Sequence, residues 1–218
     1  KEKLKNKDKM ISNFLVPICF WIKNKLKKNK TIIIGLSGGQ GTGKTTTSSI
    51  IEIILKKYFK LKVFKISIDD FYKTRKERMK LSKNIHSLLK IRGVPGTHDI
   101  NLMTDFFQNI QKNKFKPMIL PKFDKSVDDR VKKAKWYKLK NKPDVVIFEG
   151  WCVGAKAQVL KDLKKPINSL EKKSDKSMKW RKYVNYQLLN KYKKFHKMID
   201  HLLYLKAENF TLLRKWRL

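Results

Sequence analysis

The sequence has little cysteine, little arginine and no long apolar run. Its two cysteines, Cys19 and Cys152, are too few for a disulfide scaffold, and neither belongs to a CxxC pair or to a Cys/His spacing that binds a metal. This excludes the small disulfide-stapled proteins and the zinc-finger class. We expect a reducing, cytoplasmic setting.

The apolar run from Met10 to Ile22 follows a basic stretch and so has the outline of a signal peptide. It is broken by Pro17 and two polar residues, is too short to span a bilayer, and is followed by lysines where a cleavage site would need small residues. We therefore predict a helix that caps the domain, and no membrane partner.

Basic residues far outnumber acidic ones. Lysine and arginine total 54 against 18 acids, which gives a formal charge of +36 and a pI near 10.2. Such a balance usually indicates a nucleic-acid or anionic-membrane partner. Only seven of these residues are arginine, however, and the lysines are scattered through every segment. Nucleic-acid readers rely on arginine forks and aromatic platforms, which are not visible here, so we expect no nucleic-acid partner.

The length of 218 residues suits a single domain, residues 1–218. Within it we expect a P-loop strand and helix at 30–60, a helical insertion at 155–200, and the start of a candidate lid helix at 207–218. Because the sequence starts without methionine and stops inside a helical pattern, a fragment that lacks its C-terminal end is one interpretation. The sequence does not predict an oligomeric state.

Short apolar runs alternate with longer helical patterns. The runs predict strands at Thr31–Ser37, Leu61–Ile68, Val145–Phe148 and His201–Leu205, with a candidate edge strand at Met118–Phe123 between two prolines. Helices are expected at Lys44–Tyr58, Arg78–Ile91, Asn101–Lys112, Met178–Ile199 and from Asn209 onward. This alternation predicts an α/β fold of the P-loop NTPase class, a parallel sheet with helices on both faces.

A glycine-rich loop directly follows the first predicted strand and matches GxxxxGK[ST]. Its backbone N–H groups and the dipole of the following helix suit a phosphate chain. Lys44 would neutralise the β- and γ-phosphates, and the Thr45 hydroxyl would bind Mg²⁺. The expected ATP-binding residues are Gly38, Gly39, Gln40, Gly41, Thr42, Gly43, Lys44, Thr45 and Thr46.

A P-loop by itself indicates only a bound nucleotide, and carboxylates on later strands separate the classes. Asp69 and Asp70 end the second predicted strand, at the edge where open α/β sheets bind ligands. A kinase needs a carboxylate there to orient an acceptor hydroxyl and accept its proton, and Asp69 is our candidate base. The alternative is that these acids cap a turn.

Glu149 follows four apolar residues at the end of the third predicted strand, as a Walker B acid does. We expect it to hold Mg²⁺ directly or through a water. The alternative is an incidental acid at a strand end.

Further polar residues are candidate substrate contacts. Asp99 has an equally good interpretation as the N-cap of the next helix. Arg214 and Arg217 are candidate lid arginines that could close over the phosphates, or part of a solvated helix face. The full set expected to bind an anionic acceptor is Asp70, Tyr72, Arg92, His98, Asp99, Asp124, Lys125 and Arg130.

The segments SGGQGTGKTT, SIDDFY, RGVPGTHD, PKFDKS and VIFEGWCVG, in this order, resemble the D-glycerate 3-kinase family, which is related to uridine kinase, phosphoribulokinase and pantothenate kinase. PINSLE, WRKYVN and FLVP extend the resemblance over nearly the whole chain. It implies transfer of the γ-phosphoryl of ATP to the 3-hydroxyl of D-glycerate, with Asp69 matching the base and Glu149 the metal-linked acid of the wider group. The alternative is a P-loop kinase or ATPase of the same group with another acceptor or a regulatory ATP-binding role.

Overall fold

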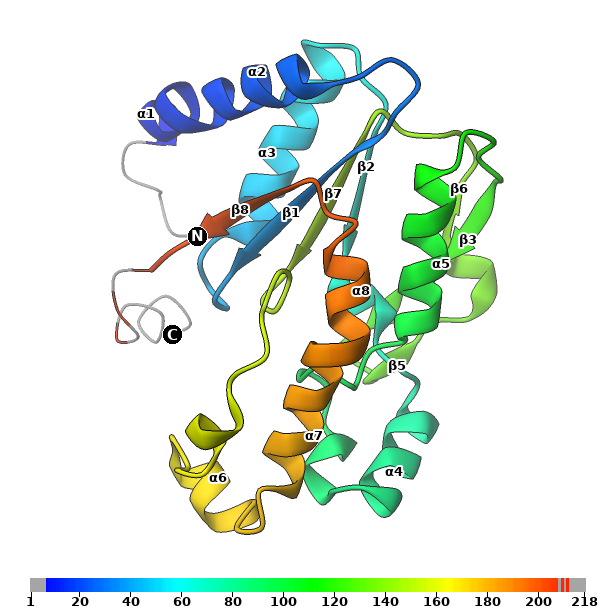
Figure 1. Cartoon of the computed structure of the whole chain (residues 1–218). Helices are drawn as coiled ribbons and strands as arrows, with labels where there is room; N and C mark the ends of the chain where they lie inside the picture. Colours follow the sequence, from blue (N-terminus) through cyan, green and yellow to red (C-terminus); the bar gives the residue numbers. More distant parts are fainter. Residues whose placement is uncertain (1–6, 208, 210, 212–218) are drawn as a thin grey trace.

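A four-stranded parallel sheet forms the centre of the computed structural model, which describes residues 7–207, 209 and 211 (Figure 1). Its strand order is β2-β7-β1-β8, and all three neighbouring pairs are parallel. The strands are β1 Ile32–Gly38, β2 Val63–Ser67, β7 Val145–Gly150 and β8 His201–Leu205. Each coincides with one of the four predicted strands, so the expected fold class is confirmed.

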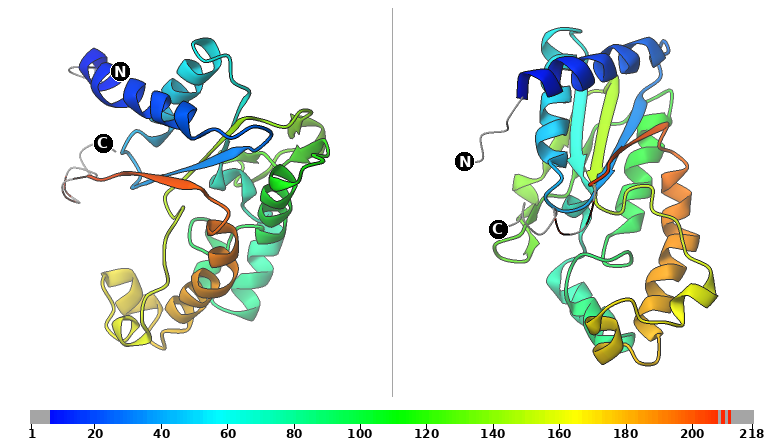
Figure 2. Two further views of the ribbon diagram at one scale, coloured as in Figure 1. Left: turned by 45° about the horizontal axis from the view of Figure 1, so that its top comes forward. Right: turned by 90° about the vertical axis from the view of Figure 1, so that its left-hand side faces the viewer.

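Successive side chains of the strands enter two different cores, one on each face of the sheet. Val145 and Ile147 of β7 pack with α2 (Val16–Lys25) and α3 (Lys44–Lys57), whereas Val146 and Phe148 pack with α5 (Ile100–Gln111) and α8 (Lys193–His196). Figure 2 shows these two helical layers on opposite sides of the sheet. Burial on both faces explains why these strands are apolar throughout rather than alternating.

The N-terminal helix caps the domain as expected. Residues 7–25 are helical through α1 (Lys7–Met10), a π-helical turn (Ile11–Leu15) and α2, and they pack over α3. Residues 179–196 are likewise helical, through α7 (Lys179–Gln187), a π-helical turn (Leu188–Tyr192) and α8. Together with the short helix α6 (Ser169–Ser174) and α4 (Arg75–Asn84), α7 lies beyond the sheet in Figure 1. Short 3-10 turns cover Ile68–Phe71 (η2), Ser87–Lys90, Lys133–Lys135 and Leu160–Leu163.

The single helix predicted at Arg78–Ile91 is wrong. The structure has α4, which begins at Arg75, and a separate 3-10 turn at Ser87–Lys90. Thr74 caps α4 by accepting from the Glu77 N–H while the Glu77 carboxylate accepts from the Thr74 N–H. This capping box fixes the start three residues before the predicted one, and the T-x-x-E spacing was present in the sequence.

The segment Met118–Phe123 is extended, but it is not an edge of the central sheet. Its first part, β3 (Met118–Leu120), pairs antiparallel with β6 (Tyr137–Leu139) in a sheet of its own. A second small hairpin joins β4 (Phe123–Asp124) to β5 (Asp129–Arg130). Pro121 separates β3 from β4, because proline lacks the N–H that a continuous ladder would need.

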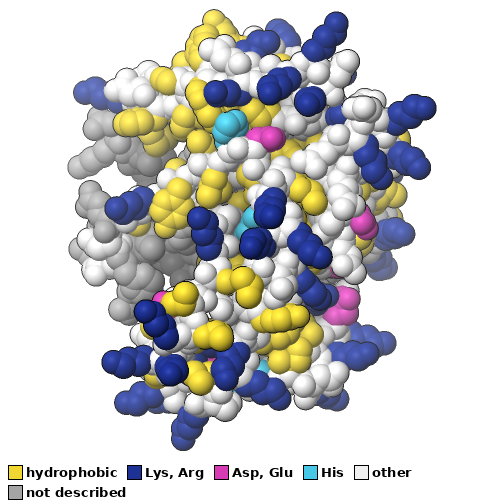
Figure 3. Space-filling view, in the orientation of Figure 1, with side chains coloured by type: hydrophobic (Ala, Val, Ile, Leu, Met, Phe, Trp, Pro, Cys, Tyr) yellow, Lys and Arg dark blue, Asp and Glu magenta, His cyan; other side chains and the backbone are white. Residues whose placement is uncertain are grey.

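Lysine and arginine side chains are spread over the whole face seen in Figure 3, with few acids among them. This distribution agrees with a general lysine bias rather than with one basic stripe. No helix in the described part of the chain is long and apolar enough to cross a membrane.

Candidate active site

The glycine-rich loop joins β1 to α3 in the strand-loop-helix arrangement that its motif requires. Gly43 has φ of 79°, a left-handed conformation that favours glycine directly before the helix. The Lys44 ammonium donates to the carbonyls of Gly38 over 2.9 Å and of Gly39 over 2.7 Å, so the side chain lies back across the loop. Partial burial lowers the pKa of Lys44, and the nearby carboxylates of Glu149 and Asp69 oppose that shift.

Glu149 is the last residue but one of β7 and is 7% exposed. Its two carboxylate oxygens accept from two hydroxyls of α3, that of Thr45 over 3.2 Å and that of Ser48 over 3.1 Å. Ser48 is absent from the sequence-based candidates. Its position three residues after Thr45 places it on the same helix face, which was a usable signal.

Asp69 lies on η2, directly after β2. Its backbone N–H donates to the hydroxyl of Ser67, and its carboxylate contacts the Lys125 ammonium at 2.6 Å. Burial raises the pKa of the Tyr72 phenol, and the Asp69 carboxylate, which accepts its hydrogen bond, raises it further. Asp69 is therefore held between a cation and a neutral phenol.

Asp70 points its two carboxylate oxygens at backbone groups. One accepts from the Phe123 N–H over 3.2 Å and the other from the Ser67 N–H over 3.4 Å. Burial raises the pKa of Asp70 to about 6, although these hydrogen bonds act in the opposite direction. Asp70 thus ties the end of β2 to the β4–β5 hairpin.

One cleft of about 380 Å³ brings the central candidates together. Trp151, which follows Glu149-Gly150, forms part of its wall and donates its indole N–H to the Gly93 carbonyl over 2.9 Å. Sequence reasoning did not select Trp151, because a single tryptophan after a strand carries no pattern. The lining residues are Gln40, Gly41, Lys44, Thr45, Ser67, Asp69, Asp70, Phe123, Lys125, Glu149, Gly150 and Trp151.

Arg92 and Arg130, the two arginines expected to bind the acceptor, each form an ion pair with an acid that does not line the cleft. Arg92 pairs with Asp128. Arg130 donates to Asp99 over 3.1 Å and to the Tyr72 carbonyl over 2.8 Å. Asp99 also accepts from the Leu102 N–H, so it caps α5 as the alternative interpretation held. A substrate-binding role for these residues stays a prediction.

His98 is fully buried behind Tyr72, on which its ring stacks at 4.4 Å. Its Nδ1 shares a hydrogen bond with the Tyr192 hydroxyl, and burial lowers its pKa to about 3. His98 is therefore neutral at ordinary pH and supports Tyr72 from inside the protein. Asp124 instead lies at the surface and accepts from the Ser126 N–H and hydroxyl. The candidate lid residues Arg214 and Arg217 lie outside the described residues.

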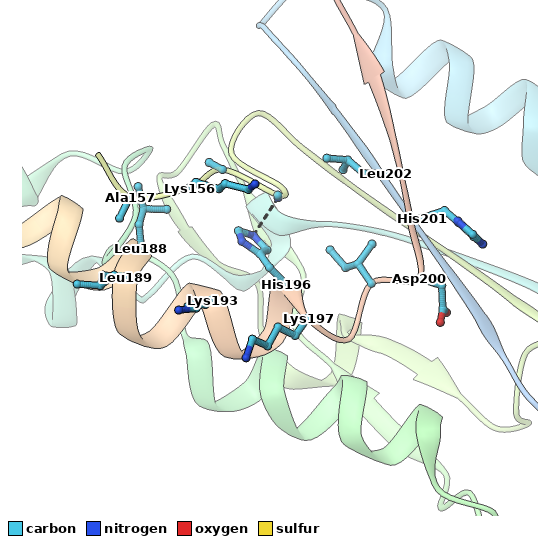
Figure 4. A pocket seen from close by; sticks show the side chains of 13 residues that line it. Lys156, Ala157, Leu188, Leu189, Lys193, His196, Lys197, Asp200, His201 and Leu202 are labelled. Atoms are coloured by element: carbon cyan, nitrogen blue, oxygen red, sulfur yellow. Dashed lines mark hydrogen bonds between the residues drawn. The ribbon is translucent and has the colours of Figure 1, made fainter. Parts of the chain in front are cut away.

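A second cavity, of about 510 Å³, lies between α8 and β8. Figure 4 shows Leu188, Leu189 and Leu202 near it together with Lys193 and Lys197. None of the sequence-predicted site residues lines this cavity. Its size alone therefore gives no reason to place the chemistry there.

The oxygen donors of the cleft suit Mg²⁺. In the described part of the chain, no three His, Cys, Asp or Glu side chains form a group that could hold a metal by themselves. Mg²⁺ in kinases is usually bound by one or two protein oxygens and by the phosphates of the nucleotide, which does not require such a group. The Thr45 hydroxyl and the Glu149 carboxylate, 3.2 Å apart beside the P-loop, fit this mode.

Comparison with known proteins gives a consistent group of relatives, although no family model matches the sequence. The uncharacterized kinase mug58 of Schizosaccharomyces pombe is 31% identical over 213 residues, which cover 91% of this chain and 73% of that protein. The chloroplastic D-glycerate 3-kinase of Arabidopsis thaliana is 27% identical over 224 residues, covering 94% of this chain and 46% of the plant protein.

Among solved structures, a D-glycerate 3-kinase from Cryptococcus neoformans var. grubii superposes with a TM-score of 0.77 and 23% identity, over 98% of this chain and 77% of that one. At this identity the likeness shows a shared fold. The fold and the sequence relatives agree on one group of P-loop kinases.

Proposed function

Because the chain belongs to the D-glycerate 3-kinase family of P-loop kinases, we propose that it transfers the γ-phosphoryl of ATP to D-glycerate, giving 3-phosphoglycerate and ADP. Kinase activity is the part that the relatives support together, and the acceptor is the finer part of the proposal.

The observation that carries the proposal is the convergence of three different kinds of group in one cleft. Lys44 supplies a cation, Thr45 with Glu149 supplies hard oxygen donors, and Asp69 supplies a carboxylate that follows a different strand, β2. A nucleotide hydrolase, which orients water, also needs the cation and the oxygen donors. A carboxylate beside the phosphate site, reached from β2, supports a hydroxyl acceptor.

In the proposed reaction the P-loop amides and Lys44 hold the β- and γ-phosphates. The acceptor hydroxyl, oriented by Asp69, attacks the γ-phosphorus in line. As the new O–P bond forms, the bond from the γ-phosphorus to the β,γ-bridging oxygen breaks and ADP leaves. The hydroxyl proton passes to the Asp69 carboxylate, so charge and atoms balance.

Thr45 and Glu149 are the residues that would hold Mg²⁺ beside the phosphates. When bound, Mg²⁺ offsets the negative charge of the phosphate oxygens. Ser48 would keep the Glu149 carboxylate oriented toward that position, since it already donates to one of its oxygens.

The test is an ADP-release assay with D-glycerate, L-glycerate, uridine and pantothenate as separate acceptors, with the phosphorylated product identified in each case. We expect turnover with D-glycerate to exceed that with the other three, and a Lys44→Met preparation to be slower by about 100-fold or more. Preferential turnover of another acceptor would show that the protein has a different acceptor specificity within the same group of kinases. ATP hydrolysis that is indifferent to every acceptor would overturn the kinase assignment of this chain.

A further inference from the structure

Lys125 is a cation whose partner is the proposed catalytic carboxylate. Its ammonium lies 2.6 Å from Oδ2 of Asp69, and its side chain is 62% exposed whereas that of Asp69 is 25% exposed. Both residues line the cleft that contains Lys44 and Glu149. The carboxylate that must accept a proton from the acceptor is therefore paired with a largely solvated side chain.

The hairpin that carries Lys125 is fixed at its base, in contrast to the lysine side chain. The Phe123 N–H donates to Asp70, and the Arg75 N–H donates to Asp129 over 3.1 Å. At the turn itself, Asp124 accepts from both the N–H and the hydroxyl of Ser126. Lys125 is thus presented to Asp69 by a hydrogen-bonded turn, and its side chain can exchange partners without a change in the backbone of that turn.

Other nearby cations are occupied by other groups. Arg92 and the fully buried Arg78 both pair with Asp128, and Arg130 pairs with Asp99. Lys44 belongs to the phosphate loop, where it donates to two carbonyls. Among the described residues that line the cleft, Lys125 is the cation left for an acceptor.

The pair itself is weak enough to exchange. Ion pairs between exposed side chains change an equilibrium constant by only about one- to fivefold, and water screens the Lys125 ammonium in the same way, although Asp69 is the less exposed partner. A carboxylate bound inside the cleft is less solvated and would compete with Asp69 for the same ammonium. Asp69 would then face the acceptor hydroxyl without its cation.

We propose that Lys125 binds the carboxylate of an acidic acceptor, and that this exchange uncovers Asp69 only when such an acceptor is present. The inference rests on the proposed function, because it assigns the acceptor class of the same cleft. Lys125 would then select hydroxy acids over neutral polyols, and it would stay paired with Asp69 until an acidic acceptor binds.

The kinetic test compares wild type with Lys125→Gln, Lys125→Arg and the control Lys132→Gln, which alters an exposed lysine just after β5. The acceptors are D-glycerate and glycerol, which has the same carbon skeleton without the carboxylate. We expect Lys125→Gln to raise KM for D-glycerate by about tenfold or more, the effect of losing a charge-assisted hydrogen bond, with KM for ATP changed by less than about twofold. Lys125→Arg should recover most of the loss, and the Lys132 control should match wild type.

Two results would overturn the inference. If Lys125→Gln loses equal activity with D-glycerate and with glycerol, Lys125 acts on the phosphates and not on the carboxylate. Unchanged D-glycerate kinetics would leave Lys125 a solvated surface residue.

Acceptor-independent ADP release should also rise in Lys125→Gln, because Asp69 is then permanently uncovered and can orient water. An ADP release rate no higher than in wild type would contradict the proposal that Lys125 covers Asp69 when no acceptor is bound.

Direct binding separates this inference from the proposed function. Calorimetric titration of D-glycerate into the protein saturated with a non-hydrolysable ATP analogue should show saturable binding that Lys125→Gln weakens by about tenfold or more. Binding of this kind without any turnover would retain the Lys125 site and refute the kinase reaction. Turnover with binding that is independent of Lys125 would do the reverse.

Discussion

The Thr45 hydroxyl donates to Oε1 of Glu149 over 3.2 Å, although the two residues lie 104 positions apart in the chain. The pairing of β1 with β7 makes this contact, because Leu36 and Glu149 are register partners and α3 begins just beyond β1. The P-loop helix and the Walker B acid are therefore joined by a direct hydrogen bond.

Glu149→Gln tests the proposed metal-binding role. The neutral amide keeps an oxygen that can accept from Thr45 or Ser48, so we expect the free energy of unfolding to fall by no more than about 1–2 kcal/mol. Turnover should fall by about 100-fold or more, because phosphoryl transfer depends on the metal. Urea unfolding measures the stability of the variant, and steady-state rates against Mg²⁺ concentration measure its turnover. Glu52→Gln, which alters an acid on α3 that pairs with Lys56, should change neither. A Glu149→Gln enzyme with a wild-type Mg²⁺ profile would contradict the role.

Lys44→Met removes the P-loop cation while keeping its aliphatic length. We expect turnover to fall by about 100- to 1,000-fold, typical of losing one preorganised electrostatic contact in a transition state. Folding should be nearly unaffected, since only two hydrogen bonds to loop carbonyls are lost. Rates and thermal unfolding of this variant are compared with those of Lys57→Met, at the far end of the same helix. Equal activity of the two variants would contradict the assignment.

Gly150→Ala should damage both stability and catalysis. A Cβ at this position would come within 2.3 Å of Cγ2 of Ile68 and 3.0 Å of its Cβ, so the residue that opens η2 must shift. Overpacking of this kind costs about 1–3 kcal/mol, and η2 carries Asp69. Chemical unfolding and turnover measured on one preparation check the coupling. Full stability with full activity would show that the site beside Ile68 accommodates the added methyl group, contrary to the structure.

The stability of the protein should depend on pH through Asp70. Its pKa is raised from 3.8 to about 6 on folding, so the native state holds the proton more tightly than the unfolded chain. The resulting stabilisation is fully present below about pH 3.8 and is lost as pH rises through about 6; a shift of this size corresponds to about 2–3 kcal/mol.

Urea unfolding of wild type and Asp70→Asn between pH 4 and pH 8 measures this contribution. The difference in unfolding free energy, wild type minus variant, should decrease as pH rises through 6. Asp105→Asn, which alters an exposed acid on α5, is measured in parallel as the control. A difference for Asp70→Asn that grows with pH would mean that the carboxylate is stabilised in its charged form.

The central sheet could be predicted from the sequence because its strands are buried on both faces. Runs such as Val145 to Phe148 then become short continuous apolar signals, whose length and β-branched content favour strands over helices. The sequence also predicted that Lys44, Asp69 and Glu149 lie close together, because parallel strands bring their carboxyl ends to one edge of the sheet. The family resemblance agrees with the relatives of the chain.

The partners of individual side chains could not be predicted. Arg92 and Arg130 belong to the set expected to bind an anionic acceptor, yet Asp128 and Asp99 reach them from segments that meet only in the folded protein. His98 has the sequence context of a surface turn and lies instead beneath Tyr72. Such contacts depend on how loops pack, for which local propensity and periodicity give no signal. The division into subsegments, the lid role and the cytoplasmic setting stay predictions.

The most direct test of the account is a single-turnover measurement on Asp69→Asn with D-glycerate, excess enzyme and γ-labelled ATP. If Asp69 accepts the acceptor proton, phosphoryl transfer should slow by about 100-fold or more, whereas ATP affinity measured by titration should stay within about threefold of wild type. Asp105→Asn, the matched exposed control, should transfer at the wild-type rate. Transfer by Asp69→Asn at the wild-type rate would contradict the proposed base, and with it the assignment of the cleft as a hydroxyl-phosphorylating site.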